Sequence, residues 1–212
     1  MDVFKKLEEL EQLKQESTDT SKILKTIFQL IKKNRDVFAL ACLAEIAADS
    51  YRKQFWPFIW AEEILNIAES IETRDAFEEK ILRDALIKLA AMLPVQVIIN
   101  KVPELQEESR ILVVIIRALR KRERLSSDER IKVIKVIGQR FFTENRKIRQ
   151  EVARTLRKIA TAREVPYLIS MISRATDYYT RKEWIQVINS IISKDEQEFL
   201  EKFKEGLQLL ES

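Results

Sequence analysis

The chain has 212 residues, a net charge of +4, 34% charged residues, no histidine, one cysteine and two glycines. One cysteine and no histidine exclude an internal disulfide framework and a zinc site of the usual Cys/His type. Scarce glycine argues against tight strand turns and phosphate-cradling loops, because both need its conformational freedom. We therefore expect an almost wholly helical chain that binds no metal and no cofactor.

The predicted helices follow one another in pairs along the chain. Residues 2–16 are predicted to form a first helix without a clear partner. The next segments predict helices over 18–34 and 36–48, over 57–71 and 74–93, and over a short stretch after Pro94 and 107–123. Ser126 and Asn145 predict N-caps for helices over 126–142 and 145–160. A turn at 175–179 separates the helices predicted over 165–174 and 180–194, and residues 195–210 are left as a terminal helix.

One aliphatic position recurs in the second helix of every pair, in steps of 43, 33, 37 and 32 residues. The residues at this position are Leu43, Leu86, Leu119, Leu156 and Ile188. A period in this range is typical of stacked helical hairpins. It predicts an all-α, right-handed α-solenoid of about five hairpins over 18–194, with capping helices over 1–17 and 195–212. The whole of 1–212 would form one domain, whose long surface favours binding over catalysis.

In the helix predicted over 145–160, Arg149 near the start is followed by Val152, Ala153 and Leu156, and Arg181 lies near the start of the helix over 180–194. This pattern resembles that of HEAT repeats, which are HEAT/armadillo-type helical repeats. The resemblance covers most of the chain and is clearest in the fourth and fifth hairpins. In that family the second helix carries an arginine near its start, followed by small and aliphatic positions. Here Arg149 and Arg181 occupy the arginine position. The first three hairpins depart from the pattern, with Asp36, Glu79 and Leu112 at the corresponding position. The resemblance implies a HEAT-like scaffold in which the second helices line a concave face.

The positive charge is concentrated between residues 117 and 163, where 16 basic residues stand against 5 acidic ones. On the helices after Glu107 and Asn145, most cations fall opposite the apolar arc, so they are expected to converge on one surface. Arg149 lies within the apolar arc and is expected to hold a turn or a neighbouring hairpin. The predicted polyanion-binding residues are Lys88, Arg110, Arg117, Arg120, Lys121, Arg146, Lys147, Arg154, Arg157 and Lys158.

The expected partner of this surface is DNA or RNA, or else an acidic protein segment. No aromatic residue lies between Arg110 and Arg140, which favours contact with the backbone or a duplex over base stacking. One alternative is a protein–protein adaptor in a larger complex without nucleic acid. A second, suggested by resemblance, is a HEAT-like DNA glycosylase of alkylation repair. Such enzymes use an aspartate with flanking aromatic residues, and the predicted polyanion-binding residues include neither.

Two of the three tryptophans, Trp56 and Trp60, lie in the aromatic segment 55–60, and the third is Trp184. Trp60 and Trp184 share helical faces with aliphatic residues and are expected in the core, whereas Trp56 and Phe58 are candidates for docking a protein partner. Without histidine, paired cysteines or a glycine loop, we expect no enzyme and no small-molecule substrate. No uncharged apolar run, Ile111 to Ile116 among them, is long enough to span a membrane. We expect a soluble, cytoplasmic protein with no membrane partner, and its charge-rich composition is compatible with a thermophilic source.

Overall fold

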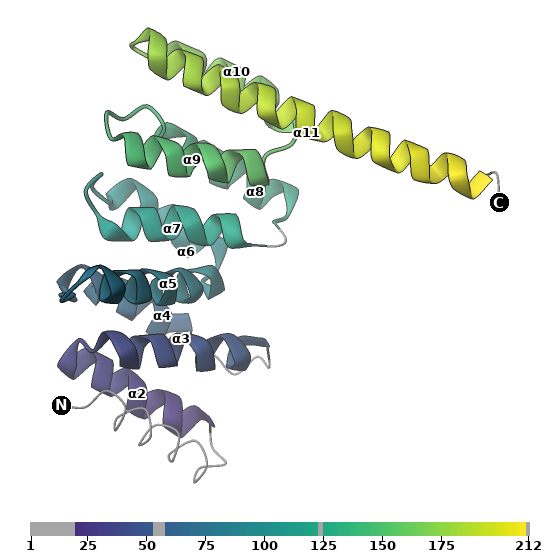
Figure 1. Ribbon diagram of the computed structural model, residues 1–212. Coiled ribbons are helices and arrows are strands. Elements are labelled where there is room, and N and C mark those ends of the chain that lie inside the picture. Colours follow the sequence, from purple (N-terminus) through teal and green to yellow (C-terminus); the bar gives the residue numbers. More distant parts are fainter. Residues whose placement is uncertain (1–19, 53–57, 123–124, 211–212) are drawn as a thin grey trace. The chain divides into compact units, whose positions relative to one another are not determined.

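The computed structural model describes residues 20–52, 58–122 and 125–210, and every regular element within them is a helix (Figure 1). The first α-helices are α2 (Thr20–Asn34), α3 (Val37–Arg52), α4 (Phe58–Ile67), α5 (Ala76–Met92) and α6 (Val95–Lys101). They are followed by α7 (Arg110–Lys121), α8 (Ser127–Gln139), α9 (Arg146–Ile159), α10 (Val165–Ser170) and α11 (Tyr178–Leu210). Short 3-10 helices adjoin some of them: η1 (Ala68–Ser70), η2 (Val102–Glu104), η3 (Ala162–Glu164) and η4 (Ile172–Arg174). None of the described helices is both long and apolar enough to cross a membrane.

Helix starts follow the capping residues that the sequence offers. The Asp75 side chain accepts a 2.8 Å hydrogen bond from the Glu78 amide at the start of α5. Ser126 and Glu129 form a reciprocal capping box on α8, and Asn145 accepts from the Lys147 amide at 3.1 Å on α9. The predicted caps Ser126 and Asn145 are therefore confirmed.

The C-terminal helix differs from the prediction. A break was expected between Lys194 and Asp195, but α11 is one continuous helix of 33 residues. The segment contains no proline, and Gly206 is its first glycine, so nothing in the backbone stops the helix at this point. A 3.8 Å ion pair from Lys194 to Glu198, one turn apart, spans the expected break. The helix predicted over 2–16 lies outside the described residues.

The described residues divide into two compact units. The first is drawn from Met1–Ile98 and Glu108–Ala118, and the second from Ile99–Glu107 and Leu119–Ser212. The boundary falls within the third predicted hairpin, since both α6 and α7 contribute residues to each unit. Whether residues 1–212 act as one domain stays a prediction.

The first unit is built around α3, which packs against α2 and α5, while α4 packs against α5. The side chains of Leu43 on α3 and Leu86 on α5 are completely buried. Burial of a leucine side chain contributes about 1.5–3 kcal/mol, so these positions are major sources of stability. Trp60, which was expected in the core, is only half-buried, and it stacks on Phe28 with ring centroids 5.0 Å apart.

The second unit is built around α9, which packs against α8 and α11, while α10 packs against α11. Trp184 is fully buried, with its ring 4.8 Å from that of Phe141 and its Nε1 donating to the Leu168 carbonyl at 2.8 Å. The predicted core position of Trp184 is confirmed. Leu119, Leu156 and Ile188 are buried as well, so every repeated aliphatic position lies inside its own unit.

Candidate nucleic-acid interface

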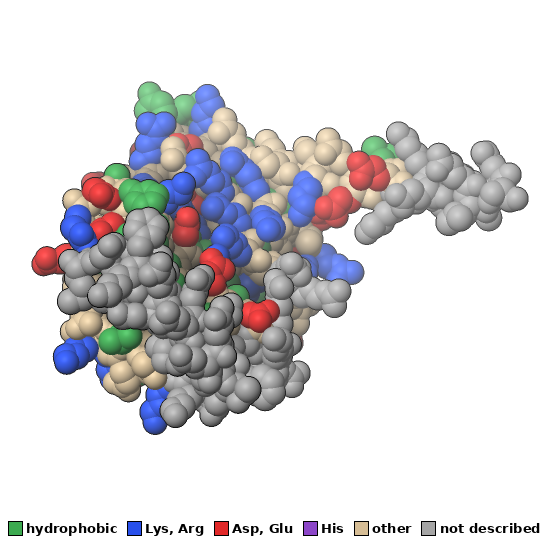
Figure 2. Space-filling model, turned by 60° about the horizontal axis from the view of Figure 1, so that its bottom comes forward, with side chains coloured by type: hydrophobic (Ala, Val, Ile, Leu, Met, Phe, Trp, Pro, Cys, Tyr) green, Lys and Arg blue, Asp and Glu red, His purple; other side chains and the backbone are tan. Residues whose placement is uncertain are grey.

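Helix α9 divides cleanly into a buried and a charged side. Ile148, Val152 and Leu156 are at most 1% exposed, and they recur at the four-residue spacing that places side chains on one face. The opposite side carries exposed cations, namely Arg146, Lys147, Arg154, Arg157 and Lys158. Figure 2 shows a dense group of Lys and Arg side chains on one face.

Most of these cations lack an acidic partner. Among the described residues, no carboxylate lies within ion-pair distance of Arg146, Lys147, Arg157 or Lys158. Arg157 and Lys158 stand in the last turn of α9, where a positive charge also stabilises the negative end of the helix. Stabilisation of the helix end requires cations in the last turn only. It does not account for Arg146 and Lys147 at the opposite end.

The exception is Arg154, which shares a carboxylate with Arg120. Glu151 has a side chain only 3% exposed, with one oxygen 3.1 Å from Arg120 Nη1 and the other 3.2 Å from Arg154 Nη1. A buried carboxylate needs such compensation, because its desolvation is costly. Arg120, which is 27% exposed, is thereby committed largely to structure, whereas Arg154 remains 57% exposed.

Arg149 has the structural role that the sequence predicted. Its Nη1 donates to the carbonyls of Thr143 and Glu144 at 2.7 and 3.1 Å, which holds the turn before α9. Its Nε lies 3.1 Å from Glu183 of α11. The guanidinium therefore ties α9 to both its own turn and the next long helix.

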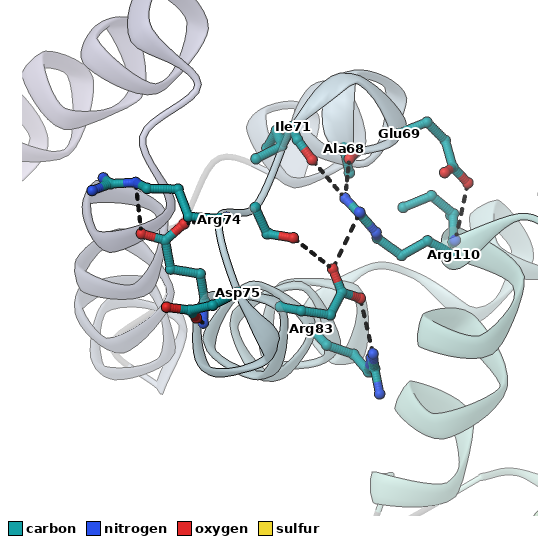
Figure 3. Close-up of polar contacts among 11 residues, drawn as sticks. Ala68, Glu69, Ile71, Arg74, Asp75, Arg83 and Arg110 are labelled. Atoms are coloured by element: carbon teal, nitrogen blue, oxygen red, sulfur yellow. Dashed lines mark hydrogen bonds and ion pairs between the residues drawn. The ribbon is translucent and has the colours of Figure 1, made fainter.

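Arg110, in the first unit, is also occupied by protein groups (Figure 3). Its Nη1 donates to the carbonyls of Ala68 and Ile71 at 3.1 and 2.8 Å, and its Nη2 lies 3.2 Å from Glu79. Ala68 is the first residue of η1 and Ile71 is its C-cap, and the Ala68 carbonyl also accepts from the Ile71 amide at 3.3 Å. The position indicates that Arg110 fastens α7 to η1 and α5.

The remaining predicted binding residues are spread over both units. Lys88 of α5 pairs with Glu45 of α3 within the first unit. Arg117 also belongs to the first unit and is half-buried, so its predicted convergence on one surface with the cations of α9 stays a prediction. Lys121 is exposed in the second unit. Trp56 lies outside the described residues, as does the side chain of Phe58, so the predicted docking spot stays a prediction.

The structure adds two residues to which the sequence assigned no function. Tyr178 and Tyr179 were expected in a turn, but they form the first turn of α11 and are 70% and 78% exposed. Their rings contact edge to face with centroids 5.8 Å apart. The aromatic pair followed by Arg181 and Lys182 is the signal that the sequence offered.

Two carboxyl groups of the second unit have a pKa below the ordinary value. The pKa of Asp177 lies below its usual value, chiefly because the Thr180 backbone amide donates to it at 2.9 Å; Arg149 adds a smaller attraction. The pKa of Glu129 is lowered chiefly by the Ser126 backbone amide. Both shifts belong to helix caps and indicate structure rather than acid–base chemistry.

Chemically, the exposed side of α9 offers guanidinium and ammonium groups. Within the described residues no group of three His, Cys, Asp or Glu side chains is placed to hold a metal ion. Comparisons with protein-family models, with curated proteins and with solved structures found no match to this chain.

Proposed function

We propose that this protein is a noncatalytic HEAT-like scaffold that binds a nucleic acid through the exposed cations of α9. The observation that carries the proposal is the set of four exposed cations, Arg146, Lys147, Arg157 and Lys158, without an ion pair to any described carboxylate. Like charges on one helix repel one another, and phosphate groups relieve that repulsion when they bind. Binding requires only positioned cations, which a helix surface can supply.

The α-solenoid is part of the same proposal, and the helix contacts support it. Within the units, α2 packs on α3, α4 on α5, α8 on α9 and α10 on α11, as successive helical hairpins would. In addition α3 packs on α5 and α9 on α11, which is the contact expected between second helices of neighbouring hairpins.

Two arginine contacts support the HEAT-like character. Arg149 donates to the carbonyls of the turn before α9, and Arg181 donates to the Ala175 carbonyl at 3.4 Å before α11. Arg149 also lies near enough to Asp177 to lower its pKa. These contacts resemble the ladder of acidic residues and arginines between HEAT repeats. Capping of the array by residues 1–17 and 195–212 belongs to the proposal.

The test measures the affinity of the full chain for a short DNA duplex and for a single strand over a salt series. About four to six phosphate contacts predict a log–log slope of roughly −4 to −5 for the duplex. Neutralising three unpaired cations in Lys147→Gln/Arg157→Gln/Lys158→Gln should make the slope shallower by about 3, with weaker binding to every sequence. Arg120 and Arg154 are left intact, because removing them would disturb Glu151.

A matched control removes the same charge from scattered positions. Lys33→Gln/Lys80→Gln/Lys132→Gln neutralises three exposed lysines, one of them in the last turn of α2. Its slope should differ from the wild type by less than about 1. Equal weakening by both triple variants, or no binding at low salt, would refute the proposal. Tighter binding of polyglutamate than of nucleic acid would assign the surface to acidic protein segments, as the adaptor alternative requires.

A further inference from the structure

Helices α9 and α11 run side by side in the same direction within the second unit. Near their starts, Arg149 Nε lies 3.1 Å from Glu183 Oε2. Near the end of α9, the Lys194 ammonium lies 3.4 Å from the Lys158 carbonyl oxygen. Because the contacts advance together along both helices, the two N-terminal ends lie at the same end of the pair.

An open groove of about 270 Å³ separates the two helices on one side. Its apolar floor includes Ala153 and Val187, which are 8% and 1% exposed. Arg154 and Arg157 of α9 line one wall, and Gln186 of α11 lines the other. Apart from Glu183, which is paired with Arg149, the polar lining consists of cations and neutral amides. The groove therefore favours an anionic occupant.

The exposed tyrosine pair lies at the N-terminal end of this groove. Tyr179 is four residues before Glu183 and seven before Gln186, so it shares their face of α11. On α9, Arg146 precedes the lining residue Gln150 by four residues and extends the basic wall toward the same end. Tyr179 is 78% exposed and touches Tyr178, so a planar ring can stack on it.

We propose that the α9–α11 groove binds a single strand of nucleic acid, with Arg154 and Arg157 on phosphates and Tyr179 stacked on a base. This inference rests on the proposed function and specifies its partner. Cations that follow a groove, together with exposed aromatic rings, are how proteins hold single strands with little sequence preference. A duplex keeps its bases stacked inside, so it would use the cations without the tyrosines. The sequence favoured duplex or backbone contact because no aromatic residue lies between Arg110 and Arg140, and the tyrosines of α11 lie further along the chain.

The test compares two single strands that differ only in their bases. The full chain is titrated with an oligothymidylate of about ten nucleotides and with an abasic strand of the same length. Wild-type protein should bind the oligothymidylate about 5- to 150-fold more tightly, the range for one stacked base. Tyr178→Ala/Tyr179→Ala should bind both strands equally, at the wild-type affinity for the abasic strand. Its duplex affinity should not change.

Control variants separate stacking from unfolding. Tyr178→Phe/Tyr179→Phe keeps both rings and should retain the preference for the oligothymidylate. Phe77→Ala removes a comparably exposed aromatic from α5, in the first unit, and should leave all affinities unchanged. Equal wild-type affinity for both strands, or a preference that survives the double alanine change, would overturn this inference and leave the proposed function standing. Absence of binding to any strand or duplex at low salt would overturn both.

Discussion

Arg120 Nη1 lies 3.1 Å from an oxygen of Glu151 whose side chain is only 3% exposed, and the pair joins the end of α7 to α9. Arg154 contacts the other oxygen from the solvent side. Two cations of the basic segment are thus balanced against one buried carboxylate. Arg120 therefore mainly maintains the fold, whereas the more exposed Arg154 can also contact a partner.

Arg120→Gln should lower the free energy of unfolding by about 1–3 kcal/mol, because the buried Glu151 would lose a charged hydrogen-bond donor. Arg154→Gln removes the other donor to the same carboxylate and is the matched control. Its side chain is 57% exposed, so its loss should cost less than about 1 kcal/mol. Urea denaturation of the full chain measures both. Equal losses for the two variants would contradict the assignment of Arg120 to structure.

Arg110→Gln should lower the free energy of unfolding by about 1–3 kcal/mol, since it leaves the Ala68 and Ile71 carbonyls and Glu79 without this donor. Arg83 pairs with the same Glu79 at 2.9 Å, one helical turn away. Arg83→Gln should therefore cost only about 0.3–0.5 kcal/mol. Arg110→Lys should not restore stability, because an ammonium cannot reproduce the fork of the guanidinium. A fully stable Arg110→Lys variant would argue against this anchor.

Local chemistry could be predicted from the sequence, whereas contacts between helices could not. The caps at Ser126 and Asn145 depend on residues a few positions away, and the phase of α9 correctly placed Arg149 on its structural side. The phase of the helix predicted over 107–123 placed Arg110 among the binding cations, because a helical wheel cannot show that the carbonyls of Ala68 and Ile71 accept hydrogen bonds from it. Tyr178 and Tyr179 were assigned to a turn, whereas they begin α11. Their exposure could not be predicted either, because it depends on how α11 packs against its neighbours.

Trp184→Phe should lower the free energy of unfolding by about 2–4 kcal/mol. The indole is fully buried, and its removal leaves the Leu168 carbonyl without its 2.8 Å donor and a gap beside Phe141 and Phe142. Phe77 of α5 is 65% exposed, so Phe77→Leu should change the free energy of unfolding by less than about 0.5 kcal/mol. Thermal unfolding followed by circular dichroism measures both. If Trp184→Phe lowered the free energy of unfolding by less than the Phe77 control does, the hydrogen bond from Trp184 to the Leu168 carbonyl would not stabilise the fold.

The capping box of α8 should give a stability that depends on pH. The Ser126 amide and hydroxyl each donate to Glu129 Oε2 at 2.9 Å, and these bonds lower the pKa of Glu129 below its ordinary value of 4.5. Because the pKa is lower in the folded state, the stabilisation is fully present above pH 4.5 and is lost as pH falls through the folded pKa.

The variant Glu129→Gln should therefore be less stable than the wild type by about 0.5–2 kcal/mol near pH 7. The difference should shrink as pH falls below 4.5, since the wild-type carboxyl then also becomes neutral. Asp128→Asn removes the same charge from the same turn without touching the capping bonds, so its difference should change less with pH. Urea denaturation at intervals between about pH 7 and about pH 3 measures these differences. A constant difference for Glu129→Gln over that range would show that the charged form of Glu129 is not the one that the cap stabilises.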